Sequence, residues 1–308
     1  MSSNYTPWEN APSLTVIAAS QQGGSRGAQL WGIQFNNQLY SIYQVSPGGG
    51  WSGWSAPNWN QSEPVIDIAA SQQGANDGRV ELWALDQRQQ LWSCWQTSPG
   101  GDWTEWSGPN WNSAPQLNGI AACSQGGTRG AQLWGIDQNY NLNTTYQTSA
   151  GNGWSSWFPW NPQIQCMDLA AADQNDGRVQ LWVIDMQMQL WTVWQTSPGG
   201  DWTSPWAGPN WEGAPKLQYI AASQQGGKRG AQLWGITDDY HLVSIYQTSP
   251  GGNWSGWSGN DWEGAPTVYH IAACLQNNGC VQLWAITTDN ILIANTQTSP
   301  GGDWSGWQ

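Results

Sequence analysis

Arginine recurs at matching places along this chain, each time just ahead of a glutamine or glutamate and a tryptophan, as in Arg79, Glu81 and Trp83. A guanidinium group is a rigid fork of hydrogen-bond donors, and a carboxamide or carboxylate adds acceptors. An indole offers a flat apolar face. Together these groups suit a ligand with apolar faces and paired hydroxyl groups. The candidate binding residues are Arg26, Arg79, Arg129, Arg178, Arg229, Gln29, Glu81, Gln132, Gln180, Gln232, Trp95, Trp194, Tyr43, Tyr146 and Tyr246.

These residues belong to a unit that occurs six times. Each copy closes on a phrase with two tryptophans, such as SPGGDWTEW at Trp103 and Trp106. The first tryptophans of successive copies are 48 to 52 residues apart, and a period of this length is typical of arrays of small β-units. We place the units at about 13–59, 60–111, 112–160, 161–211, 212–262 and 263–308.

Within a unit, four short segments are separated by Gly, Asn, Asp and Pro, which punctuate strands. None of the segments shows sustained helical periodicity. The sequence therefore predicts an all-β protein with a single domain over residues 1–308, a six-bladed β-propeller of four-stranded blades. The Ile68-Ala69-Ala70 segment and its equivalents fit the crowded innermost position, and the tryptophan pair fits the outermost. Most of the 28 tryptophans are expected to pack between blades.

The two ends of the chain bear on how the ring closes. A linker with a tryptophan follows each tryptophan pair except the last, and the missing copy stands at the beginning, where Trp8–Pro12 matches Trp211–Pro215. We expect residues 1–12 to close the ring between units six and one. Closure by a strand exchanged between the ends is the open alternative.

The units also alternate in type. The first, third and fifth read GGSRGAQLWGI or a close variant, whereas the second and fourth read NDGRVELWAL or NDGRVQLWVI. The sixth has Cys280 in place of the arginine. The sequence thus predicts a pseudo-threefold repeat of blade pairs. Either the grooves between blades are of two kinds, or the alternation only records the duplication of a two-blade unit.

Composition excludes several classes of protein. The formal net charge is −13 and only 9% of residues are charged, which argues against binding to nucleic acid or insertion into membranes. No motif calls for a cofactor, and five cysteines at irregular spacing do not form a disulfide framework. The first residues have no basic start and no apolar run. We therefore expect cytoplasmic synthesis without a signal peptide, with release by a leaderless route left open.

At the level of motifs, the unit NDGRVELWALDQRQQLWSCWQTSPGGDWTEW resembles the repeat of the Photorhabdus-type bacterial β-propeller lectins and, more loosely, the tectonin-like lectins. The resemblance runs through all six units. It implies glycan partners, with fucose or O-methylated sugars as ligands, bound in shallow sites between adjacent blades. Repeated weak sites would act through avidity. Such lectins are commonly seven-bladed, whereas this chain has six units. Association into a homo-oligomer stays open.

Two other functions remain as alternatives. The residue before the innermost strand is Asp67, Asp168 or His270 in the even units, and a convergence of these three on the central channel would form a metal site for a propeller enzyme. The second alternative is a scaffold that binds proteins through one face of the ring.

Overall fold

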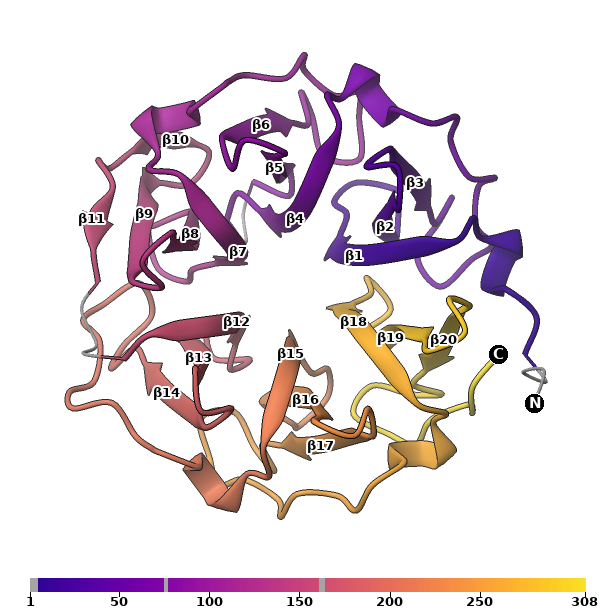
Figure 1. Ribbon diagram of the computed structural model, residues 1–308, viewed down its shortest axis with the longest axis vertical. Helices are drawn as coiled ribbons and strands as arrows, with labels where there is room; N and C mark the ends of the chain where they lie inside the picture. Colours follow the sequence, from indigo (N-terminus) through magenta and orange to yellow (C-terminus); the bar gives the residue numbers. More distant parts are fainter. Residues whose placement is uncertain (1–4, 75–76, 161–163) are drawn as a thin grey trace.

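The fold is a closed ring of six β-sheets. It is described by a computed structural model over residues 5–74, 77–160 and 164–308. The innermost strands of the sheets lie side by side in the cyclic order β1, β4, β7, β12, β15, β18 and back to β1 (Figure 1). The chain is therefore all-β, with six blades around an axis. The expected boundary between units three and four touches residues 161–163, which lie outside the described residues.

Each blade is an antiparallel meander of three main strands. Their bounds are β1 Leu14–Gln21, β2 Ala28–Gln34 and β3 Leu39–Tyr43 in blade one; β4 Val65–Gln72, β5 Val80–Asp86 and β6 Leu91–Trp95 in blade two; β7 Leu117–Ser124, β8 Ala131–Asp137 and β9 Leu142–Ser149 in blade three; β12 Cys166–Asp173, β13 Val179–Asp185 and β14 Leu190–Trp194 in blade four; β15 Leu217–Gln224, β16 Ala231–Thr237 and β17 Leu242–Tyr246 in blade five; and β18 Val268–Leu275, β19 Val281–Thr287 and β20 Leu292–Thr296 in blade six. Blade three also carries the short strands β10 Asn152–Trp154 and β11 Phe158–Pro159.

The expected fourth strand differs from the one observed. In five blades the tryptophan-pair segment joins the third strand only through isolated bridges, such as Gln44 with Trp51. A serine or threonine hydroxyl replaces a backbone carbonyl as acceptor: Ser52 Oγ accepts the Tyr43 N–H at 3.1 Å, while the Ser52 N–H donates to the Tyr43 carbonyl. The same exchange recurs in every blade. The outer edge of the third strand is thus hydrogen-bonded without a regular fourth strand in five blades, so its backbone is not left as a free edge.

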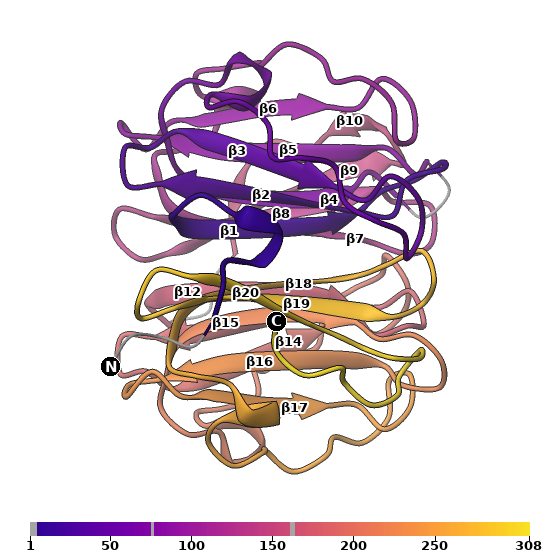
Figure 2. The same cartoon turned by 90° about the vertical axis from the view of Figure 1, so that its right-hand side faces the viewer.

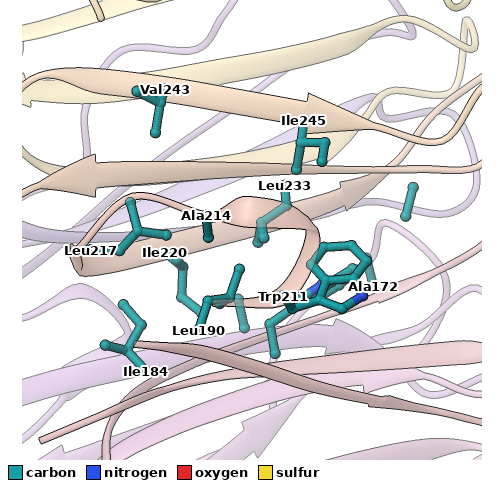
Figure 3. Close-up of a cluster of buried hydrophobic side chains, with 13 residues drawn as sticks. Ala172, Ile184, Leu190, Trp211, Ala214, Leu217, Ile220, Leu233, Val243 and Ile245 are labelled. Atoms are coloured by element: carbon teal, nitrogen blue, oxygen red, sulfur yellow. The ribbon is translucent and has the colours of Figure 1, made fainter. Parts of the chain in front are cut away.

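Three tryptophans pack together at each junction between consecutive blades, which we call a seam. Between blades four and five these are Trp182 of β13, Trp211 of the linker and Trp254 of the next tryptophan pair, with Trp211 and Trp254 in edge-to-face contact at 4.8 Å. Such geometry lets one ring's positive edge meet another's negative face. Figure 3 shows Trp211 among the buried aliphatic side chains of this seam.

The seam between blades six and one has the same arrangement, although its linker comes from the start of the chain. Trp8, in the short 3₁₀ turn η1 (Trp8–Asn10), lies 4.9 Å from Trp51 and 5.9 Å from Trp284, measured between ring centroids. Figure 2 shows the N-terminal segment running beside the last blade. In the other seams the matching turns are η2 Trp59–Gln61, η3 Trp111–Ser113, η4 Trp211–Gly213 and η5 Trp262–Gly264. No helix in the described part of the chain is long and apolar enough to cross a membrane.

Candidate functional site

A pocket of about 240 Å³ opens in the seam between blades two and three. Blade two supplies Arg79, Glu81 and Trp95, the linker supplies Trp111, and blade three supplies Trp154. Arg79 ends the turn before β5, and the alternation of the strand brings Glu81 to the same side of the sheet. The sequence-predicted residues of this unit therefore meet in one cavity, together with aromatic side chains of the next blade.

Asp77 neutralises the arginine in this pocket. Arg79 Nε donates to Asp77 Oδ1 at 2.6 Å and Nη2 donates to Oδ2 at 2.7 Å. This pairing holds the pKa of Asp77 below its usual value and raises that of Arg79. Glu81 is buried and accepts a hydrogen bond from Ser93 Oγ at 2.5 Å. Burial raises the pKa of Glu81 to about 8, so its carboxyl group is mostly protonated at neutral pH.

The seam between blades four and five repeats this design in a larger pocket of about 440 Å³. It contains Arg178, Gln180, Trp194, Trp211 and Glu212, with Trp254 from blade five. Arg178 donates from Nε and Nη2 to Asp176 Oδ2 at 2.9 and 2.6 Å. Gln180, which stands at the position of Glu81, donates to the hydroxyl of Thr192. These two seams, which follow the even blades, form one type of pocket.

The seam between blades one and two is of a second type. Its pocket of about 350 Å³ is lined by Arg26, Gln29 and Tyr43 of blade one and by Asp102 and Trp103 of blade two, among others. The Arg26 guanidinium lies over the Tyr43 ring, 4.1 Å from its centroid, and forms no ion pair within the described residues. Gln29 donates to Ser41 at 2.6 Å. Its buried Oε1 has no hydrogen-bond partner in the described structure.

The remaining odd blades share this second arrangement. Arg129 lies 4.5 Å from the centroid of Tyr146, and Arg229 lies 4.2 Å from that of Tyr246. Gln132 and Gln232 donate to hydroxyl groups of their own third strands, and their Oε1 atoms lack a partner within the described ranges. The alternation read from the sequence thus corresponds to two chemical environments of arginine.

Sequence reasoning missed two groups of pocket residues. One is the linker tryptophans, which were expected only to pack; Trp59, Trp111 and Trp211 also line the pockets. The other is Asp102, which precedes Trp103 and lines the pocket between blades one and two. A usable signal was present, because the residue before the first tryptophan of each pair is aspartate in the even blades and glycine or asparagine in the odd blades.

The alternative of a metal site in the central channel does not fit the described residues. Asp67 Oδ2 accepts the Ile120 N–H of the next blade at 3.0 Å, and Asp168 Oδ2 accepts the Ile220 N–H at 2.8 Å. Burial raises the pKa of each carboxyl group to about 7 and lowers that of His270 to about 3. No group of three or more His, Cys, Asp or Glu residues in the described ranges is placed to hold a metal ion. The two carboxyl groups instead join adjacent blades near the axis.

Comparison with solved structures identifies similar folds. The BP39L lectin from Burkholderia pseudomallei has a TM-score of 0.63 at 20% identity, covering 94% of this chain and 82% of that one. The Aleuria aurantia lectin, a fungal six-bladed β-propeller described with a fucose recognition mode, has a TM-score of 0.65 at 15% identity, covering 97% and 96%.

A third similar structure is AofleA from Arthrobotrys oligospora, with a TM-score of 0.67 at 15% identity, covering 95% of this chain and 85% of that one. No family model and no curated protein matches the sequence. At these identities the similarity shows the fold, and this chain has the fold of the six-bladed β-propeller lectins.

Proposed function

We propose that this protein is a multivalent lectin that binds fucosylated glycans in its seam pockets. The observation that carries the proposal is the recurrence, in three seams, of an arginine and a Gln or Glu of one blade beside tryptophans of the linker and the next blade. Guanidinium and carboxamide groups match paired hydroxyls, and indoles match the C–H faces of a sugar ring. O-methylated sugars are the second ligand class to test.

Two further observations support fucose as the first sugar to test. Complexes of the Aleuria aurantia lectin with alpha-methyl-L-fucoside and with Fucalpha1-6GlcNAc have this fold, as does the SapL1 lectin in complex with alpha methyl fucoside. The repeat of this chain also resembles that of the Photorhabdus-type lectins. Weak single sites acting together would give an avidity gain of about 10²–10⁴ on a glycan-coated surface.

A glycan array probed with the intact protein tests this proposal, followed by titration with methyl α-L-fucopyranoside. We expect fucosylated glycans to be retained and the monosaccharide to compete. Replacing all five repeat arginines (Arg26→Ala, Arg79→Ala, Arg129→Ala, Arg178→Ala and Arg229→Ala) should abolish retention. The matched control is Arg88→Ala, because Arg88 lies outside these pockets, beside Trp92 and Asp86. Failure of the parent protein to retain any glycan would overturn the proposal.

A further inference from the structure

The repeat arginines and aspartates show a pattern that divides the seams into two classes. After the even blades, each arginine is paired with an aspartate two residues earlier on its own blade: Asp77 with Arg79 and Asp176 with Arg178. The odd blades have a glycine at that position, as in Gly24 before Arg26. Their aspartate comes instead from the next blade, immediately before its first tryptophan.

In the seam between blades one and two, the two charges therefore line one pocket, each from its own blade. Arg26 of blade one and Asp102 of blade two both line the pocket between these blades, yet no ion pair joins them in the described structure. Asp102 is exposed, and its carboxylate accepts no hydrogen bond from any described residue. By the repeat, we expect Arg129 to face Asp201 and Arg229 to face Asp303.

The Ser-Pro-Gly-Gly turn of the following blade contacts Arg129 and Arg229 in the same way as it contacts Arg26. A Cβ added to Gly100 would lie 3.4 Å from Cγ of Arg26, one added to Gly199 would lie 3.6 Å from Cδ of Arg129, and one added to Gly301 would lie 3.5 Å from Cδ of Arg229. Each of these glycines stands two residues before the aspartate of its loop. The three loops thus bring their aspartates to equivalent seams.

From this pattern we infer that the seams after blades one, three and five are the principal saccharide sites, which we call open seams. There a neutral sugar bridges the arginine and the next blade's aspartate through adjacent hydroxyl groups. One hydroxyl accepts from the guanidinium of Arg26 and its neighbour donates to Asp102. The inference rests on the proposed lectin function and deepens it.

The seams after blades two and four, which we call closed seams, are expected to bind sugar more weakly for the same reason. The aspartate of the same blade already takes hydrogen bonds from Nε and Nη2 of each arginine. A ligand there meets a neutralised guanidinium with fewer free donors. Hydrogen bonds to charged groups are the stronger ones, so we expect the open seams to bind at least about tenfold more tightly.

The experiment compares two sets of carboxylates. Methyl α-L-fucopyranoside is titrated into the parent protein by calorimetry, with native mass spectrometry counting bound sugars. We expect three tight sites per chain. The variant Asp102→Asn, Asp201→Asn, Asp303→Asn should lose about tenfold or more in affinity at all three. Its unfolding temperature should not change, because these side chains are exposed. The matched variant Asp77→Asn, Asp176→Asn should keep the three tight sites.

Three results would overturn the inference. If the triple variant titrates like the parent while the five-arginine variant fails to bind, the protein is a lectin but its open seams are not the principal sites. If both aspartate variants weaken binding equally, the two classes do not differ. If the parent protein binds no sugar at all, the proposed function fails and this inference fails with it.

Discussion

The seam between blades four and five and the seam between blades six and one have nearly the same framework but different polar chemistry. In the first, Trp182 and Trp254 meet edge to face at 5.8 Å, and in the second Trp284 and Trp51 do so at 5.7 Å. The interplanar angle is 88° in both. The second is completed by Trp8 from the other end of the chain.

The polar residues of these two seams diverge at the arginine turn. Arg178 and Asp176 of blade four are replaced in blade six by Cys280 and Asn278. Asn278 Oδ1 still accepts the N–H of residue 280 at 2.9 Å, as Asp176 accepts that of Arg178 at 3.0 Å. The turn is therefore kept without its charges. Tryptophan packing therefore builds the ring in both seams, while the arginine and the aspartate are not required for the turn to form.

The substitutions expected to destabilise the protein most remove one framework tryptophan from each seam. Trp182→Ala and Trp284→Ala each remove a fully buried indole, which typically costs about 3–5 kcal/mol. We expect both variants to lose similar stability in denaturant unfolding, although only one seam carries an arginine. A much smaller loss for Trp284→Ala would mean that the last seam is packed loosely and that the shared framework is only apparent.

The sequence could predict this framework because its signals are periodic. A Leu-Trp pair, such as Leu283-Trp284, stands at the same position in all six units, and so do the small residues of the innermost strands. The position of Trp8 also followed from its match to Trp211. The sequence did not predict that the fourth segment forms no regular strand in five blades. There the hydroxyl groups of Ser52 and its equivalents accept the backbone N–H groups of the third strand. A sequence pattern does not distinguish a hydroxyl acceptor from a carbonyl acceptor.

A second prediction compares the two closed seams through the residue that differs between them, Glu81 in one and Gln180 in the other. Burial raises the pKa of Glu81 to about 8, so the folded state holds an extra proton between about pH 4.5 and 8. The free energy of unfolding then falls as pH rises through this range. Glu81→Gln should therefore stabilise the protein at pH 9 by about 1–3 kcal/mol, with little effect at pH 5.

Unfolding curves of the parent and Glu81→Gln proteins across this pH range provide the measurement. Gln180→Glu is the matched control, because it should introduce the same pH dependence beside Thr192. Parallel curves for all three proteins would show that Glu81 is solvated enough to ionise freely.

The site was harder to predict than the fold because its residues come from different blades. Arg79 immediately precedes the strand that carries Glu81, and the two were found together, as were Gln29 and Tyr43. Asp102 lies on the blade after Arg26, and only the ring geometry brings the two to one pocket. The alternative of a metal site at Asp67 has a similar cause, because the backbone N–H that Asp67 binds lies on the next blade and leaves no mark in the sequence.

A third prediction concerns Arg178, whose replacement should affect sugar binding but not the free energy of unfolding. Arg178 forms an ion pair with Asp176 in which both side chains are about one-quarter exposed, and such pairs contribute about 0–1 kcal/mol. Arg178→Ala should therefore change the free energy of unfolding by less than about 1 kcal/mol while removing one weak sugar site. Native mass spectrometry at high sugar concentration counts the sites. Loss of several kcal/mol would instead make the arginine part of the framework.

The smallest expected change in stability comes from rebuilding the polar residues in the last seam. Asn278→Asp, Cys280→Arg and Thr296→Trp copy the side chains of Asp176, Arg178 and Trp194 onto blade six. The turn there already has the required geometry, and Gly48 of blade one approaches Asn278 as Gly251 approaches Asp176 and Arg178.

Asn278 is exposed and Thr296 is half-buried, whereas Cys280 is buried. Because Arg178 at the equivalent position is about one-quarter exposed, we expect an arginine at position 280 to reach solvent and the variant to unfold within about 0.5 kcal/mol of the parent. It should bind one more sugar per chain at high concentration, with the weak affinity of a closed seam. Cys280→Arg alone is the control, because it adds the cation without its aspartate. If the rebuilt seam folds normally and binds nothing, arginine, aspartate and indole at these positions are insufficient for a site. The difference between the two seams would then lie in their packing as well as in their charges.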